Sequence, residues 1–96
     1  MIAAFSITPL GVGESVGAQV AEAVRLVRQS GLPNETNAMF TNVEGEWDEV
    51  MNLVKACVEK VAEGTQRVSV VVKIDYRPGF EGAITKKLES LNRHLG

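Results

Sequence analysis

Two charged residues in the stretch RVSVVVKIDYRPG, residues 67–79, are the first candidates for chemistry in this chain. Lys73 and Asp75 interrupt a run of valines and isoleucines, two residues apart. Because residues i and i+2 of a strand project to the same face, the two charges are expected to lie side by side on a hydrophobic strand. An exposed pair contributes only about 0–1 kcal/mol, whereas a pair buried at an interface fixes register or serves a ligand. Spacing alone favours a structural role, and Val71 on the same face favours a subunit interface.

Glu44 is a third candidate, because it directly precedes Gly45 at the end of an expected strand. Its carboxylate could bind a ligand. Alternatively, its charge could complement the N-terminus of the helix that follows, where Glu46, Asp48 and Glu49 are also acidic. Both interpretations fit the sequence equally well.

Motifs of known catalytic and metal sites are missing from the sequence. It contains no GxSxG, GxxxxGK[ST], HExxH or CxxC pattern. The segment GVGESVG, residues 11–17, lacks the lysine and the third glycine of a phosphate-binding loop and is expected to be an ordinary loop. Cys57 lies in an apolar helical stripe and is expected to be a buried hydrophobic residue, and His94 has no partners for a zinc site. We therefore expect no catalytic residues, no metal and no cofactor.

Composition and charge narrow the class of protein further. The 96 residues are 45% hydrophobic and 23% charged, which is typical of one globular domain, here residues 1–96. A net charge of −2 argues against a nucleic-acid or anionic-membrane partner. No apolar run approaches the roughly 20 residues of a membrane span, and the N-terminal residues lack the pattern of a signal peptide. A single cysteine fits a reducing compartment, so we expect a cytoplasmic protein.

The periodicity of apolar residues predicts seven elements. The first is a strand over 2–8, broken by Pro9 and the glycines that follow, and the second is a helix capped by Ser15 and ended by Gly31. The segment 34–45 predicts two short strands with a reversal near residues 38–39. A helix over 46–64 includes Trp47, which is expected to anchor it to the core. A strand over 67–75 and a helix that carries Phe80, Ile84, Leu88, Leu91 and Leu95 complete the chain.

This βαββαβ order with a C-terminal helix predicts an α+β fold, a ferredoxin-like sandwich with a four-stranded antiparallel sheet. Both main helices then cover one face of the sheet. Alternation assigns to that face Ala3, Phe5, Ile7, Val68, Val70, Val72 and Ile74. It assigns to the opposite face Ala4, Ser6, Thr8, Ser69, Val71, Lys73 and Asp75. A small, partly apolar face of this kind is commonly covered by another subunit.

Three motifs together carry a resemblance that spans almost the whole chain. They are SITPLG at residues 6–11, MFTNVEGEWDEVMNLVK at residues 39–55, and RVSVVVKIDYRPG at residues 67–79 followed by a helix. With these motifs the chain resembles the small thiamine-binding proteins of ferredoxin-like fold, which are related to tandem-repeat thiamine/hydroxymethylpyrimidine-binding proteins. The resemblance implies non-catalytic binding of thiamine or its hydroxymethylpyrimidine half. It also implies a homotetramer, built from dimers whose sheets associate.

The ligand implied by this resemblance sets requirements for the site. An aminopyrimidine needs amide, hydroxyl or carboxylate partners, and the cationic thiazolium favours a carboxylate and an aromatic face such as Phe40 or Tyr76. The expected ligand-binding residues are Ser6, Thr8, Asn37, Met39, Thr41, Glu44, Lys73 and Asp75. Taken alone, Met39 is better explained by packing than by contact with a ligand.

Other function classes stay open from the sequence alone. The chain could be a regulatory or interaction module that senses a small molecule, or a small enzyme of unknown reaction. The absence of a nucleophile–base set argues against the enzyme. The expected partners are a small-molecule ligand and further copies of the chain, with no nucleic acid and no membrane.

Overall fold

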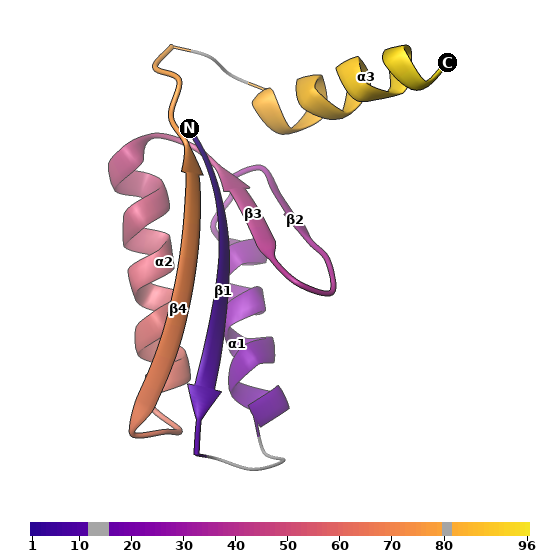
Figure 1. The fold of residues 1–96 in the computed structure, drawn as a ribbon. Coiled ribbons are helices and arrows are strands. Elements are labelled where there is room, and N and C mark those ends of the chain that lie inside the picture. Colours follow the sequence, from indigo (N-terminus) through magenta and orange to yellow (C-terminus); the bar gives the residue numbers. More distant parts are fainter. Residues whose placement is uncertain (12–15, 80–81) are drawn as a thin grey trace.

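The computed structural model describes residues 1–11, 16–79 and 82–96. Its elements follow the predicted order (Figure 1). They are β1 (Ile2–Leu10), α1 (Val16–Gln29), β2 (Asn34–Thr36), β3 (Thr41–Glu44), α2 (Trp47–Ala62), β4 (Arg67–Asp75) and α3 (Ala83–Leu95). Ser15, the predicted cap of the first helix, and Phe80, the first residue of the third predicted stripe, lie outside the described residues.

The four strands form one sheet in the order β2-β3-β1-β4, and all three pairings are antiparallel. The predicted ferredoxin-like sandwich is therefore confirmed. Figure 1 shows α1 and α2 together on one face of this sheet. No helix layer covers the other face in the part of the chain that the structure describes, and we call it the open face. The register places Lys73 beside Ala4 and Asp75 beside Ile2, on the open face as predicted.

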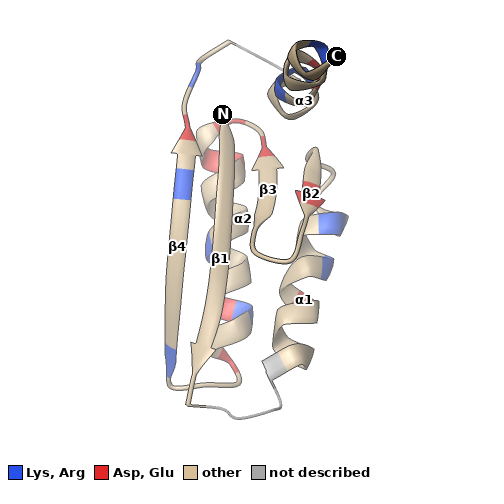
Figure 2. Cartoon of the chain, turned by 45° about the vertical axis from the view of Figure 1, so that its right-hand side comes forward, with Lys and Arg blue, Asp and Glu red and all other residues tan. Residues whose placement is uncertain are grey.

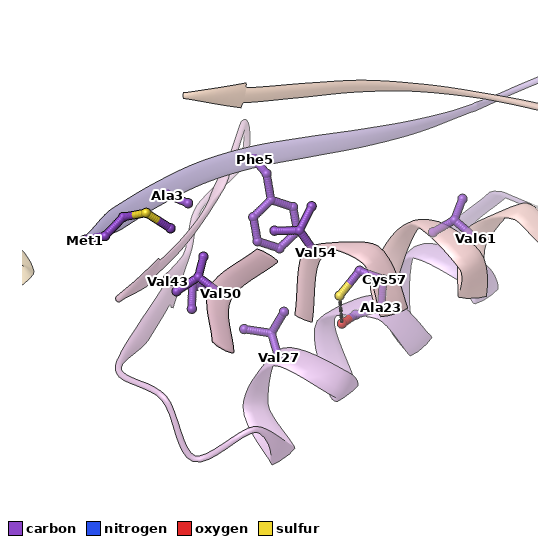
Figure 3. Packing of buried hydrophobic residues seen from close by; sticks show 10 residues of the cluster. All are labelled: Met1, Ala3, Phe5, Ala23, Val27, Val43, Val50, Val54, Cys57 and Val61. Carbon is purple, nitrogen blue, oxygen red and sulfur yellow. Dashed lines mark hydrogen bonds between the residues drawn. The ribbon is translucent and has the colours of Figure 1, made fainter. Parts of the chain in front are cut away.

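The hydrophobic core lies between the sheet and the two helices (Figure 3). Val27, Val43, Val50, Val61 and Cys57 are fully buried in it. Burying a side chain of this size stabilises the fold by roughly 1.5–3 kcal/mol. The core is consequently where most of the free energy of unfolding originates.

Cys57 belongs to this core, as its place in the apolar stripe predicts. Its Sγ lies 3.4 Å from the backbone oxygen of Ala23, to which the thiol donates (Figure 3). Burial raises the pKa of the thiol to about 11. A thiol held protonated in this way is a poor nucleophile.

The first strand is longer than the sequence predicts, because Pro9 does not end it. Pro9 pairs with Val68 and Leu10 pairs with Arg67 of β4. The partner on the other side, β3, covers β1 only as far as Phe5. Beyond Phe5, β1 is an edge strand on that side, and a proline that lacks a backbone N–H is tolerated there.

Trp47 does not anchor α2 in the core, which contradicts the prediction. Its side chain is 48% exposed. Its ring makes an edge-to-face contact with Tyr76, which follows β4, at a centroid distance of 6.0 Å and an interplanar angle of 89°. Trp47 is the first residue of α2, and the first buried residue of this helix is Val50, one turn later. The Trp47 ring packs against another exposed aromatic ring instead of the core.

The C-terminal helix α3 stands apart from the two-layer sandwich. It lies beyond the end of the sheet at which β1 begins (Figures 1 and 2). Among its described residues only Ala83 is buried. The leucines of its apolar stripe are exposed, from about half of Leu88 and Leu91 to 75% of Leu95. An apolar stripe without a covering surface is typical of a contact with another protein.

Candidate ligand-binding site

A cavity of about 250 Å³ lies on the helix side of the sheet, between α1 and the hairpin of β2 and β3. We call it the hairpin cavity. Its apolar wall comes from Phe5 and Ile7 of β1, and from the face of α1 that carries Val24 and Val27. Its polar side chains come from Thr36, Asn37 and Thr41, and the turn residues Ala38, Met39 and Phe40 also line it. Ser6 borders the cavity too, but it lies between Phe5 and Ile7 on β1, so its side chain projects to the opposite face of the sheet.

The turn at the edge of this cavity is held by a single asparagine. The backbone N–H of Asn37 donates to the oxygen of Phe40 at 3.0 Å. The Oδ1 of Asn37 accepts from the backbone N–H groups of Met39 and Phe40, each at 2.9 Å. This side-chain turn explains the reversal at residues 38–39, which the sequence predicts correctly. Because Oδ1 is already engaged, Asn37 offers a ligand its Nδ2 donor.

Two threonines face each other beside this turn. Thr36 and Thr41 are direct cross-strand partners, and their hydroxyl oxygens lie 3.4 Å apart. Thr41 is buried, and both residues line the hairpin cavity. Each hydroxyl can donate or accept, so the pair can match either kind of group on a ligand. Thr36 is not among the residues that the sequence predicts for the site, because its pairing with Thr41 follows only once the hairpin register is known.

The hairpin cavity therefore combines aromatic and aliphatic walls with hydroxyl and amide groups. None of the described residues that line it is a carboxylate or a cation. Such a cavity suits a flat, neutral heteroaromatic ring with donors and acceptors at its edge.

A second cavity, of about 340 Å³, lies on the other side of the sheet, between the open face and α3. We call it the open-face cleft. Its residues are mostly charged or polar on the sheet and apolar on the helix. They are Ile2, Ala4, Glu35, Asn37, Asn42, Lys73, Asp75, Ile84, Lys87 and Leu88.

The predicted site residues are divided between the hairpin cavity, the open-face cleft and positions outside both. Ser6, Asn37, Met39 and Thr41 line the hairpin cavity. Asn37 also lines the open-face cleft, together with Lys73 and Asp75. Thr8 and Glu44 line neither cavity: Thr8 is exposed on β1, and Glu44 is 5% exposed at the end of β3. The structure thus brings half of the predicted set together around one cavity.

Glu44 has a structural partner that the sequence does not reveal. Its Oε2 accepts from the backbone N–H of Ala83 at 2.8 Å, and its Oε1 from that of Ile84 at 3.5 Å. The carboxylate therefore satisfies the first N–H groups of α3 and complements the positive end of its dipole. The sequence predicts, as one alternative for Glu44, a role at a helix N-terminus, but at that of α2 and not of α3.

Asp75 is paired with Lys87 of α3, and not with Lys73. The hydrogen bond from Lys87 lowers the pKa of the Asp75 carboxyl, and the charges of Lys87, Arg77 and Lys73 act in the same direction. Asp75 and Glu44 together fix the start of α3 to the end of the sheet. Lys73 remains on the open face two residues away.

The described residues contain no cluster of three or more potential metal ligands. None of the helices in that part of the chain is both long and apolar enough to cross a membrane.

The fold and the hairpin cavity define a ferredoxin-like domain with room for one small ring. Comparison with known proteins identifies the family. The family model for thiamine-binding proteins matches residues 3–92, and the chain belongs to this family. It is 55% identical to the UPF0045 protein MT1949 of Mycobacterium tuberculosis over 96 residues, which cover 99% of this chain and 94% of the relative.

Solved structures show the same fold. The hypothetical protein MJ1052 of Methanocaldococcus jannaschii is 37% identical, with a TM-score of 0.84 over 95% of this chain and 94% of that one. The Thermotoga maritima protein TM0486, named as a candidate thiamine biosynthesis or salvage protein, has a TM-score of 0.78 over 93% of this chain and 96% of that one. At 21% identity, this second likeness concerns the fold alone.

Proposed function

We propose that the chain binds thiamine, or its hydroxymethylpyrimidine half, in the hairpin cavity. Binding is non-catalytic and takes place in a cytoplasmic homo-oligomer. The observation that carries this proposal is the composition of the cavity, in which two facing threonine hydroxyls and an amide donor line an otherwise apolar space. Membership of the thiamine-binding family supports the same ligand class.

The chemistry of the cavity suits the pyrimidine half better than the thiazolium half. The 4-amino group of the pyrimidine needs an acceptor, and its ring nitrogens need donors. Thr36 and Thr41 can supply both, and Asn37 supplies a donor through Nδ2. Burying the thiazolium cation in a cavity without a carboxylate would be costly. The pyrimidine therefore enters the cavity and the thiazolium stays at its solvent side, near the exposed Met39.

A homo-oligomer is supported by the apolar surface that one chain leaves uncovered. Val71 on the open face is 55% exposed, and the leucines of α3 are exposed nearby. A homotetramer, as a dimer of dimers, provides two kinds of contact that can cover these surfaces. Sedimentation of the wild-type chain as a 10.4 kDa monomer at micromolar concentration would contradict this part of the proposal.

Calorimetric titration tests the site. Wild-type protein is titrated with thiamine, thiamine phosphate and hydroxymethylpyrimidine, and the Thr41→Val variant with whichever of them bind. We expect Thr41→Val to weaken binding about tenfold, equivalent to about 1.4 kcal/mol, because one hydrogen bond is lost while the shape is kept. Thr8→Val is the matched control, since Thr8 lies outside the cavity.

Three outcomes would contradict the proposal. Wild-type protein that binds none of the three compounds would exclude the ligand class. Equal affinities of Thr41→Val and wild type would move the site out of the hairpin cavity. Turnover of a bound compound would show that binding is not the whole function.

A further inference from the structure

The second half of β1 has a neighbouring strand on one side only. β3 pairs with β1 as far as Phe5, whose partner is Thr41, whereas β4 pairs with β1 all the way to Leu10. Figure 2 shows β1 continuing past the end of β3. On the β3 side, the main chain of β1 after Phe5 therefore forms a free edge of the sheet.

The main-chain groups that point to this free edge belong to alternate residues of β1. In an antiparallel sheet, the N–H and C=O of one residue point to one neighbouring strand, and those of the next residue point to the other. The N–H of Gly45 donates to the oxygen of Met1 at 3.1 Å, so residue 1 points to the β3 side. The oxygen of Leu10 accepts from Oγ1 of Thr65 at 2.6 Å, on the β4 side. By this alternation, the N–H and C=O of Ile7 point to the free edge.

Ile7 supplies the N–H donor of this edge. Pro9 is the next residue of β1 that points the same way, and a proline has no N–H. The described part of the chain shows no hydrogen bond to the N–H or the C=O of Ile7 on this side. Because unpaired main-chain groups are costly wherever water is excluded, this residue needs a partner when the space beside it is filled.

The free edge borders the hairpin cavity. Ile7 lines the cavity. Ser6 also borders it although the Ser6 side chain projects to the opposite face, which places the peptide bond between Ser6 and Ile7 at the cavity wall. Phe5 and Val24 make the surrounding wall apolar, and hydrogen bonds are stronger in such surroundings.

We infer that the main chain of Ile7 recognises the 4-aminopyrimidine ring of the ligand. The N–H of Ile7 donates to the ring nitrogen beside the amino group, and the C=O of Ile7 accepts from the amino group. The ring thus makes the two hydrogen bonds that a residue of a neighbouring strand would make. The inference rests on the proposed function and adds the contact that makes the cavity selective for an amino-substituted ring.

The selectivity follows from the fixed polarity of main-chain groups. The hydroxyls of Thr36 and Thr41 can each donate or accept, so they tolerate either polarity on a ring. The N–H of Ile7 can only donate, and its C=O can only accept. A 4-oxopyrimidine carries a proton on the ring nitrogen and an acceptor oxygen beside it, so that donor would face donor and acceptor would face acceptor. The cavity should therefore reject the oxo ring.

A peptide strand fits this edge less well than a small ring does. Strand addition depends on a series of main-chain donors and acceptors along the edge. After Phe5 this edge offers both groups at Ile7 and only a C=O at Pro9, and β1 ends at Leu10. A ring needs no more than the donor and acceptor of Ile7.

Amide hydrogen exchange, followed by NMR on the wild-type protein, tests the inference directly. In the free protein we expect the amide of Ile7 to exchange about tenfold faster than those of Ser6 and Thr8, which point to β4, once intrinsic rates are corrected for. Saturating hydroxymethylpyrimidine should slow the Ile7 amide about tenfold and leave the other two unchanged.

Calorimetric titration tests the selectivity. We expect the 4-oxo counterpart of hydroxymethylpyrimidine to bind wild-type protein about a hundredfold more weakly, because two hydrogen bonds are replaced by two mismatches. Ile7→Pro removes the N–H at an edge position like that of Pro9, and Ile7→Ala is the matched control that shortens the side chain and keeps the N–H. Hydroxymethylpyrimidine should bind Ile7→Pro about tenfold more weakly than Ile7→Ala.

The possible failures are distinguishable. An Ile7 amide that is already as slow as its neighbours in the free protein would overturn the inference, since the edge would then be paired. Hydroxymethylpyrimidine binding that leaves this amide unchanged, or equal affinities for the amino and oxo rings, would overturn it and leave the proposed function intact. Wild-type protein that binds neither ring would remove both. These measurements on wild-type protein decide the matter even where Ile7→Pro does not fold.

Discussion

The two faces of the sheet are built from the same strands and have opposite chemistry. On the helix side, Ala3 and Phe5 of β1 are buried against α1 and α2, and the few polar groups lie around the hairpin cavity. On the open side, the alternate residues of the same strands include charges at both edges, which solvent reaches. The two faces therefore suit different kinds of binding partner. The helix side can enclose a small ring, and the open face can bind another protein.

The difference in burial between the two sides of the sheet is tested by shortening one valine to alanine on each side. Val50→Ala should lower the free energy of unfolding by about 2–3 kcal/mol, since Val50 is fully buried and the change leaves a cavity. Val71→Ala should change it by less than about 0.5 kcal/mol in the monomer. Urea unfolding at a concentration that keeps the chain monomeric measures both values. Similar losses in the two variants would mean that the open side is part of the core.

An effect of similar or somewhat smaller size is expected where α3 joins the sandwich. Glu44→Ala removes both acceptors of the Ala83 and Ile84 N–H groups, and should cost about 1.5–3 kcal/mol, the range for hydrogen bonds to a charged group. Amide hydrogen exchange should accelerate through residues 83–95 and stay slow in α2.

The conservative variant Glu44→Gln refines this prediction. It keeps one acceptor oxygen, so it should accelerate exchange in α3 less than alanine does. Glu59→Ala is a suitable control because Glu59 is an exposed glutamate on α2, where it lies 3.9 Å from Lys55 and lines neither cavity. If Glu44→Gln weakens thiamine binding while exchange in α3 is unchanged, Glu44 is a ligand carboxylate and not the anchor of α3.

The smallest expected effect concerns pH. Because Lys87 lowers the pKa of Asp75 in the folded state, this pair stabilises the fold above the ordinary carboxyl pKa of about 3.9. That contribution is lost as the pH falls through the lower, folded-state pKa. A carboxyl NMR titration should place the midpoint of Asp75 below the ordinary value in wild type. In Lys87→Met the midpoint should rise towards it, and an unmoved midpoint would show that Lys87 is not the cause.

Much of the difference between the two faces of the sheet could be predicted from the sequence. Alternation along residues 67–75 correctly puts Lys73 and Asp75 together on the face opposite the helices, because a strand has a fixed period of two. The partners of these residues could not be predicted. Asp75 pairs with Lys87, and Glu44 contacts Ala83, 39 residues away, so both contacts depend on where the last helix comes to lie.

The residues of the hairpin cavity could likewise be predicted only in part from the sequence. The sequence predicts Thr41 as a site residue because its hydroxyl suits the ligand that the resemblance implies, and the structure places it at the cavity. Thr36 was missed, because its role depends on the exact register of a strand of only three residues. Periodicity does not fix the register of so short a strand. The position of Trp47 is predicted wrongly because the helical stripe includes it, whereas burial along α2 begins only at Val50.

The edge-to-face contact of Trp47 with Tyr76 provides an intrinsic fluorescence probe of this part of the molecule. Trp47 is the one tryptophan of the chain, and Tyr76 lies on the segment between β4 and α3. Indole emission depends on the polarity and the packing around the ring, so it will change when this segment shifts. Neither ring lines the hairpin cavity. Fluorescence should therefore follow movements of α3 and assembly at that end, while a ligand that fills the hairpin cavity leaves the emission nearly constant.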